Sequence, residues 1–116
     1  MGKGNKKRVT IDVSQIENKI KSKWDNKLYI LSEQVLNDCN EFVRVDQGTL
    51  KESSYIASDL SIGHLVWDTP YAKRVYYTGT PSKDVNPNAS LMWCEKAKRK
   101  YKNDWSELAQ KLMAED

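Results

Sequence analysis

The chain has 116 residues, of which 30% are charged and 39% hydrophobic, and its formal net charge is +3. This length allows one domain with a modest core. No apolar run approaches the roughly 20 residues that span a bilayer, so we expect no membrane contact. The basic first residues are not followed by an apolar stretch, so a secretory signal is not expected.

The first predicted element is a strand that follows a basic segment. Residues 1–7 consist mainly of Gly, Asn and Lys, which predicts a disordered basic arm. Along Arg8–Val13 apolar and polar residues alternate, as they do in a strand with one buried face. Ser14 and Glu17 then have the spacing of a capping box, which predicts that a helix starts there.

The longest predicted element is a helix over residues 14–43. Apolar residues recur along it at steps of three and four and define one stripe, formed by Ile16, Ile20, Trp24, Leu28, Leu31, Val35, Cys39 and Phe42. This stripe is longer than so small a core needs, so part of it is expected against a neighbouring subunit. Alternatively, the strands and the last helix cover the whole stripe, which is equally compatible with the pattern.

The middle of the chain is predicted to form a helical turn and a hairpin. Gly48 is expected to adopt a positive φ, and the capping-box spacing from Thr49 to Glu52 predicts one further turn. Residues 54–58 and 64–67 are predicted to be two strands of a hairpin. The single histidine of the sequence lies in the second strand without a cluster of metal-ligating residues, so we interpret it as an ordinary strand residue.

A short aromatic helix is predicted between Trp67 and Gly79. Asp68 or Thr69 can cap its first N–H groups, and Pro70 suits the first helical position, where its missing N–H is not needed. Gly79 can adopt the positive φ that ends such a helix.

The last predicted elements are a loop and a second long helix. Residues 80–88 contain two prolines and several turn-forming residues, which predicts an exposed, mobile loop. Asn86 or Asn88 is expected to cap the following helix, over residues 89–112. Apolar residues again share one face of that helix: Trp93, Ala97, Tyr101, Trp105, Leu108 and Leu112.

This order of elements predicts an α+β domain over residues 8–113, followed by a flexible tail at 114–116. A small, mostly antiparallel sheet would pack against the two long helices, with the short aromatic helix between them. Cys39 and Cys94 both fall on apolar stripes, which predicts buried free thiols in a reducing cytosol and not a disulfide. The large side chains expected in the core include Trp24, Leu28, Trp93 and Trp105.

Positive charge is concentrated at two places. Residues 1–8 carry four basic side chains and no acid, and residues 95–102 carry five basic side chains with Glu95. Such patches can face a polyanion, and the candidate residues are Lys6, Lys7, Arg8, Lys98, Arg99 and Lys102. A basic tail and a solvated helix face are, however, also common in proteins that bind no nucleic acid.

The sequence shows no constellation of catalytic residues. The carboxylates near turns, at Asp46, Glu52, Asp59 and Asp68, are explained as caps or solvated loop residues. Because no Ser–His–Asp, Cys–His or metal-ligand pattern is present, we predict a protein that binds other proteins, is not an enzyme and needs no cofactor.

Several segments resemble those of a known group of phage proteins. Val45–Ser53, VDQGTLKES, resembles the V-x-T-G-x-L-R-x-S segment of head–tail connector and tail-completion proteins, and Asp68–Arg74, DTPYAKR, resembles their T-P-Y-A-R segment. The opening strand before a long polar helix, and the closing Trp-rich helix, look like the minor capsid proteins of siphophages that infect Gram-positive bacteria. The resemblance extends from Arg8 to about Leu112, and its motif residues are Asp46, Gly48, Leu50, Pro70, Tyr71 and Ala72.

The chain departs from this pattern at two places. Gln47 replaces the usual Thr, which weakens a local bond from side chain to backbone but keeps the glycine after it. Tyr77 and Thr78 stand where the connector group often has an acidic residue and then a glycine. A ring contact through that acidic residue is therefore not expected here.

The resemblance implies a structural role in the virion neck, where subunits form a ring around the channel through which DNA leaves the head. The implied partners are other copies of the chain, neighbouring neck and tail-terminator proteins, and channel DNA without sequence specificity. Before assembly the protein would be in the host cytoplasm. Candidate subunit contacts lie in the predicted loop, at Thr80, Pro81, Lys83 and Val85.

An alternative class is a small basic nucleic-acid-binding protein of phage or bacterial origin. The two basic segments favour it, but no zinc signature, helix-turn-helix pattern or RNA-recognition aromatic motif supports it. Binding of the monomer to duplex DNA at moderate salt would distinguish it from a neck protein.

Overall fold

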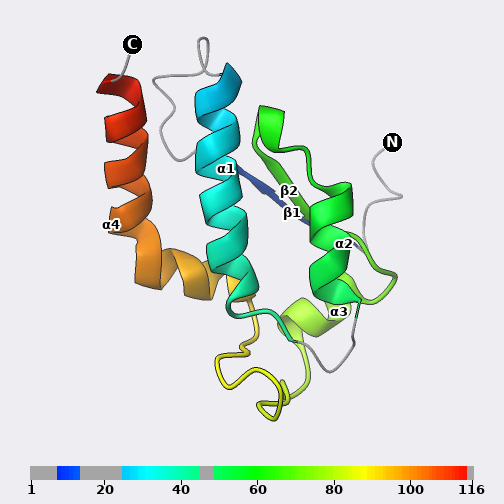
Figure 1. Cartoon of the computed structure of the whole chain (residues 1–116). Coiled ribbons are helices and arrows are strands. Elements are labelled where there is room, and N and C mark those ends of the chain that lie inside the picture. The colour runs from blue at the N-terminus through cyan, green and yellow to red at the C-terminus, as the bar shows by residue number, and fades with distance from the viewer. Residues whose placement is uncertain (1–7, 14–24, 45–48, 115–116) are drawn as a thin grey trace.

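The computed structural model describes residues 8–13, 25–44 and 49–114. Its elements follow in the order β1 (Val9–Asp12), α1 (Asp25–Asn40), α2 (Leu50–Ala57), the 3₁₀-helix η4 (Leu60–Ile62), β2 (His64–Trp67), α3 (Ala72–Tyr77) and α4 (Trp93–Ala114) (Figure 1). The predicted α+β class is confirmed. None of the described helices combines the length and the apolar character needed to cross a bilayer.

The sheet pairs two strands that are far apart in the sequence. β1 runs antiparallel to β2, with Val9 opposite Trp67 and Asp12 opposite His64. The predicted hairpin is therefore wrong, because β2 pairs with the first strand of the chain and residues 54–57 belong to α2. The strand expected at residues 64–67 is confirmed, and His64, its first residue, is the exposed one.

The helical state of residues 54–57 has a physical explanation. Leu50 and Ser54 lie four residues apart, so a helix places them on one face, and both are buried there. The hydroxyl of Ser54 also donates to the carbonyl of Lys51 within the same turn, at 2.7 Å. Tyr55 and Ile56, whose side chains favour strands, are exposed on the other side. Burial of one helical face thus outweighs the local strand preference.

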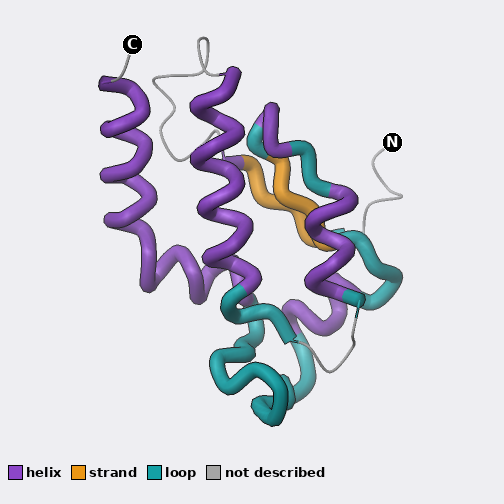
Figure 2. The backbone as a smooth tube through the Cα atoms, viewed as in Figure 1, coloured by secondary structure: helices purple, strands orange, loops and turns teal. Residues whose placement is uncertain are grey.

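α1 lies in the middle of the molecule, with α4 on one side and the sheet with α2 on the other (Figures 1 and 2). It contacts α4, η4 and β2. The part of its predicted stripe that the structure describes is mostly buried, at Leu31, Val35, Cys39 and Phe42, and Leu28 is partly buried. The positions Ile16, Ile20 and Trp24 lie outside the described residues, so the length of the stripe is not tested.

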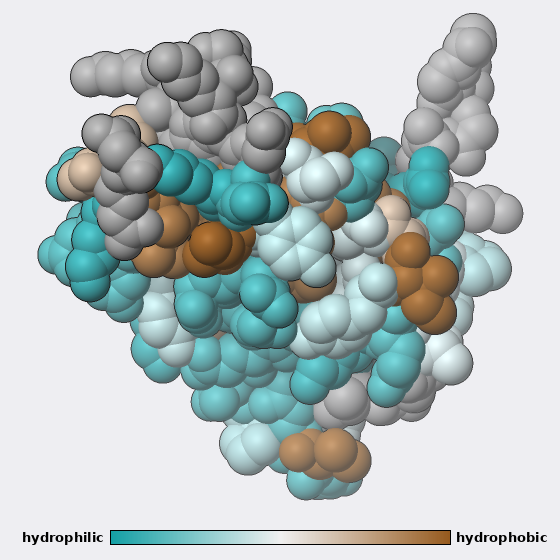
Figure 3. Space-filling model, turned by 45° about the horizontal axis from the view of Figure 1, so that its top comes forward, coloured by the Kyte–Doolittle hydropathy of each residue, from teal (hydrophilic) through white to brown (hydrophobic). Residues whose placement is uncertain are grey.

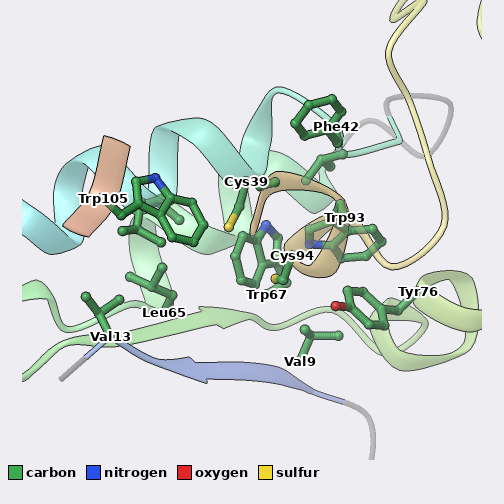
Figure 4. Close-up of a cluster of buried hydrophobic side chains, with 14 of the residues drawn as sticks. Val9, Val13, Cys39, Phe42, Leu65, Trp67, Tyr76, Trp93, Cys94 and Trp105 are labelled. Carbon is green, nitrogen blue, oxygen red and sulfur yellow. The ribbon is translucent and has the colours of Figure 1, made fainter. Parts of the chain in front are cut away.

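Three aromatic rings form the centre of the core (Figure 4). Trp93 meets Trp67 with ring centroids 6.0 Å apart and Tyr76 with centroids 4.6 Å apart, both in edge-to-face geometry. This geometry is the favoured one for aromatic pairs. Because the three rings come from α4, β2 and α3, they hold the sheet, the short aromatic helix and the last helix together. The predicted burial of Trp93 and Trp105 is confirmed.

A buried polar bridge joins α1, α2 and β2. The indole N–H of Trp67 donates to Oδ1 of Asn40 at 2.9 Å, and the amide of Asn40 donates to Oγ of Ser54 at 3.0 Å. Each group therefore has a partner in an interior where an unpaired polar group would be costly. The bridge fixes the position of α2 relative to α1.

The predicted starts of α3 and α4 need correction. α3 begins at Ala72, after the turn that contains Pro70, and Tyr71 is its N-cap. Asp68 does not cap it, because its carboxylate pairs with Arg8 at 3.3 Å, and the buried hydroxyl of Thr69 makes no hydrogen bond to the described residues. The predicted positive φ of Gly79 is confirmed, at 86°.

α4 begins at Trp93 instead of residue 89. The segment before it uses its N–H groups in tertiary bonds, from Ser90 to the carbonyl of Phe42 at 3.0 Å and from Met92 to the carbonyl of Tyr76 at 2.8 Å. Met92 also has a positive φ of 49°, which a helix does not allow. Neither predicted asparagine cap is made; Asn86 bonds to the end of α1 instead.

Candidate functional site

The loop of residues 78–92 extends beyond the ends of α1 and α4 (Figures 1 and 2). Of the predicted contact residues in this loop, Thr80, Lys83 and Val85 are exposed and Pro81 is partly buried. Val85 is 75% exposed, which is a high value for an apolar side chain. The predicted exposure of the loop is therefore confirmed for most of its residues.

The start and the middle of this loop are bonded to residues 41–44, which directly follow α1. Nη1 of Arg44 donates to the carbonyls of Val75 at 3.1 Å and Thr78 at 2.9 Å. Nδ2 of Asn86 donates to the carbonyls of Glu41 and Val43, both at 2.9 Å. Carbonyls near a helix end lack partners within the helix, so these bonds satisfy groups that would otherwise need water.

A bond network inside the loop gives it a defined shape. Nζ of Lys83 donates to the carbonyl of Ala89 at 3.0 Å and to that of Pro87 at 3.3 Å. Because the Lys83 ammonium already has these two partners, Thr80 and Val85 are the better candidates for contacts with another protein. The loop thus presents an apolar side chain on a hydrogen-bonded support.

Replacing Arg44 by alanine is expected to destabilise the domain by about 1.5–3 kcal/mol, since hydrogen bonds to charged groups contribute about that much. Cleavage of the 78–92 loop by a protease should also become faster, because Thr78 loses its anchor. Arg74→Ala is the matched control, as Arg74 is exposed on the neighbouring helix. Thermal unfolding and limited proteolysis measure both effects. Equal stability of the two variants would contradict the anchoring role.

The basic residues of α4 point to different sides of the helix. Lys98, Arg99 and Lys102 are exposed, as predicted. Lys100, in contrast, pairs with Glu41 at 3.4 Å and lies near the rings of Phe42 and Tyr101. At the other basic segment, Lys6 and Lys7 lie outside the described residues, and Arg8 forms the ion pair with Asp68. The described basic residues therefore form no single continuous stripe.

A cleft of about 330 Å³ opens between β1, α1 and α4. Its apolar lining comes from all three elements, and its polar lining comes from α4 alone. The lining residues are Ile11, Val35, Cys39, Cys94, Glu95, Lys98, Lys102, Trp105 and Ser106. An apolar cavity of about 150 Å³ accommodates a benzene molecule, so this cleft has room for a large apolar side chain.

Burial shifts the pKa values of two groups at or beside the cleft. Cys39 and Cys94 are buried free thiols, as predicted, and burial raises the pKa of Cys94 well above its usual value. A raised pKa keeps the thiol protonated and a poor nucleophile. Burial also raises the pKa of Asp38, although the indole N–H of Trp105, 2.7 Å away, opposes that shift.

Outside the cleft, two tyrosine hydroxyls have raised pKa values for structural reasons. Burial is the main cause for Tyr76. For Tyr101 the main cause is its hydrogen bond to the carboxylate of Glu41. The pKa of Lys100 is raised chiefly by Tyr101 and then by Glu41. Lys100 and Tyr101 connect α4 to Glu41, just after the end of α1.

The motif residues that the structure describes have structural positions. Leu50 and Ala72 are fully buried at the starts of α2 and α3, and the hydroxyls of Tyr71 and Thr49 are hydrogen-bonded at 2.8 Å. The side chain of Thr49 makes no capping bond, although Thr49 is the N-cap residue of α2 as predicted. Pro70 is exposed in the turn before α3. Asp46 and Gly48, including the predicted φ of Gly48, lie outside the described residues.

The sequence did not predict the most exposed large apolar side chain of the described residues. Ile56 is 85% exposed on α2, and Tyr55 beside it is about half exposed. Glu52 lies one helical turn before Ile56, on the same face, and Asp59 follows just after the helix. A helical reading of residues 50–57 would have revealed this face, but the strand interpretation placed Tyr55 and Ile56 on opposite sides of a sheet.

Within residues 8–13, 25–44 and 49–114, no group of three or more His, Cys, Asp or Glu side chains is arranged to hold a metal ion. The features that do stand out are the anchored loop, the cleft and the exposed Ile56 face. These are surfaces suited to contacts with other proteins. The arrangement of the described residues thus fits a component of an assembly.

A family model described as minor capsid protein matches residues 7–113, so the chain belongs to this family of phage minor capsid proteins. It is therefore a structural component of a phage virion. Comparisons with curated proteins and with solved structures find no match. Membership of a structural family favours a role without catalysis.

Proposed function

We propose that the protein acts in the neck of the virion, where head and tail join. In this role its copies form a ring around the DNA channel, and each copy contacts neighbouring neck and tail-terminator proteins. Membership of the family supports a role in the virion. The neck position is supported by the resemblance of two segments of this chain, Val45–Ser53 and Asp68–Arg74, to segments of connector proteins. Before assembly the protein would reside in the host cytoplasm.

The anchored loop is the observation that carries this proposal. It extends from the body of the molecule, and the bonds from Arg44 and Asn86 hold it in one shape. A binding loop that is already shaped loses less conformational entropy when it meets its partner. The exposed side chain of Val85 would then enter an apolar site on the next protein of the neck.

The exposed basic residues of α4 are suited to contact with channel DNA. Lys98, Arg99 and Lys102 are exposed and could contact phosphates without reading sequence. The alternative of a free-standing nucleic-acid-binding protein is weaker, because Lys100 and Arg8 already pair with carboxylates. Contacts with DNA would therefore come from the assembled ring, in which many copies each add a few charges.

Replacing Val85 by aspartate is expected to leave the fold unchanged and to reduce the number of particles with joined tails at least tenfold. A substitution is a sharper test than a deletion of the loop, because removing Asn86 would also break its bonds to Glu41 and Val43 after α1. Circular dichroism and thermal unfolding check the fold, and electron microscopy of complemented phage counts filled heads and joined particles.

The matched control is Gln110→Asp, which adds the same charge at an exposed position of α4. That variant should give normal particles. The position of the wild-type protein is tested separately, by gold labelling of an epitope-tagged copy in intact virions. Label at the head–tail junction is the expected result, and label elsewhere on the capsid would contradict the neck proposal.

A further inference from the structure

The cleft and the exposed side chain of Ile56 lie on opposite sides of α1. The cleft of about 330 Å³ lies between β1, α1 and α4, and the exposed Ile56 lies on α2. Figures 1 and 2 show α4 and α2 separated by α1. In the space-filling view of Figure 3, apolar surface occurs as separate patches among polar side chains. Two separate surfaces on opposite sides are what a head-to-tail ring requires of each subunit.

The charges around the two surfaces are opposite in sign. Lys98 and Lys102 line the cleft, together with one acid, Glu95. Glu52 lies on the face of Ile56, and Asp59, whose carboxylate also caps η4 through Ser61, lies two residues after the end of α2. Surfaces of opposite charge attract each other during encounter, and they disfavour contact between two copies of the same surface. The charges thus favour contact between the cleft and the Ile56 face over contact of either surface with itself.

We propose that Ile56 of one subunit inserts into the cleft of the next, with Glu52 and Asp59 facing Lys98 and Lys102. The inference rests on the ring assembly proposed above and names the contact that closes the ring. The interface is heterologous: each subunit offers its Ile56 face to one neighbour and its cleft to the other. Repeated by a rotation that closes on itself, this contact generates a ring.

The size of the cleft supports insertion of a single apolar side chain as the anchor of the interface. Of the apolar lining of the cleft, Ile11 is partly exposed and Val35, Cys39 and Trp105 are almost fully buried. An inserted branched side chain would therefore pack mainly on Ile11 and on the aliphatic stems of Lys98 and Lys102. Interface energy is usually concentrated in a few anchors that fill pockets near the centre of the contact. A stable interface buries more than ~1,200 Å², more than one side chain supplies, so the ring needs further contacts in the neck to persist.

Cysteine cross-linking in assembled virions tests this contact. The double variant Ile56→Cys/Lys102→Cys, treated with a short bismaleimide, should give a ladder of dimers and larger multimers on a denaturing gel. A ladder is expected because each subunit carries both halves of the contact. The matched control, Ile56→Cys/Lys111→Cys, places the second cysteine on α4 outside the cleft and should give no ladder.

Charge reversal gives a second test, in which a loss caused by misfolding would not be rescued by the compensating charges. Glu52→Lys should lower incorporation of the protein into virions several-fold, and adding Lys98→Glu with Lys102→Glu should restore it. The changes lie on opposite sides of the molecule, so rescue requires contact between two copies. If virions that contain the Ile56→Cys/Lys102→Cys variant join their tails but give no ladder, this inference is wrong, while the proposed function is not affected. Absence of gold label from the neck would instead overturn the proposed function.

Discussion

Replacement of Trp93 by alanine is expected to lower the free energy of unfolding by about 3–5 kcal/mol, the range for loss of a buried aromatic side chain. Trp93 is fully buried and makes edge-to-face contacts with Trp67 and Tyr76. Alanine would remove both contacts and leave a cavity where α4, β2 and α3 meet. Domains of this size lose roughly 4 °C of melting temperature per kcal/mol, so the melting temperature should fall by roughly 12–20 °C.

Trp93→Phe separates the loss of packing from the loss of the indole N–H. That N–H is buried and has no hydrogen-bond partner among the described residues. Phenylalanine keeps an aromatic ring and removes this unpaired donor, so its cost should be well below that of alanine. Chemical denaturation of both variants gives the two free energies. An alanine variant as stable as the wild type would show that α4 does not pack as described.

Replacement of Asn40 by alanine is expected to cost about 2–4 kcal/mol. The amide of Asn40 satisfies both the indole N–H of Trp67 and the hydroxyl of Ser54 in the core. Removing it leaves the buried indole N–H of Trp67 without a partner, at a cost of about 1–3 kcal/mol, and takes from the Ser54 hydroxyl the bond it accepts, although that hydroxyl keeps its bond to the carbonyl of Lys51. The loss should appear in equilibrium unfolding followed by tryptophan fluorescence, which also reports on Trp67.

Asn37→Ala is the matched control for this prediction. Asn37 is one turn earlier on α1 and accepts a hydrogen bond from the hydroxyl of Tyr55 at 3.1 Å, but at an exposed position. Water can replace that bond, so its loss should cost less than about 1 kcal/mol. If both asparagine variants lost the same stability, the buried bridge between α1, α2 and β2 would have no special role.

Regular patterns in the sequence predicted most of the elements correctly. The alternation of Val9, Ile11 and Val13 identified β1, and the spacing from Trp93 to Leu112 identified the buried face of α4. These predictions worked because each element buries one face and the period of a pattern reports which face that is. Gly79 was predictable for a different reason, since its position required a residue that tolerates positive φ.

The failures arose where tertiary contacts overrode local preference. Tyr55 and Ile56 favour strands, but the burial of Leu50 and Ser54 four residues apart made the segment helical. The partner of β2 could not be read from a local pattern, because a hairpin is the shortest solution and the actual partner lies at the start of the chain. The late start of α4 follows from bonds to Phe42 and Tyr76, which the sequence does not reveal.

The candidate surfaces were only partly predictable. The exposed loop with Val85 could be identified from its prolines and polar residues, and the exposed basic residues of α4 from the helical period. The cleft could not, because it forms between β1, α1 and α4, and three-dimensional packing alone brings Ile11 beside Lys98 and Trp105. The anchoring of the loop by Arg44 was likewise hidden, since Arg44 is 34 residues from Thr78.

The pairing of β1 with β2 has a consequence for synthesis on the ribosome. About 50 residues separate the end of β1 from the start of β2. At roughly 5–20 residues per second, β1 leaves the ribosome roughly 3–10 s before its partner strand. During that interval its apolar side chains, Val9 and Ile11, have no sheet to join. The nascent chain therefore passes through a stage at which an aggregation-prone strand is exposed, and chaperone binding is expected to be strongest before β2 emerges.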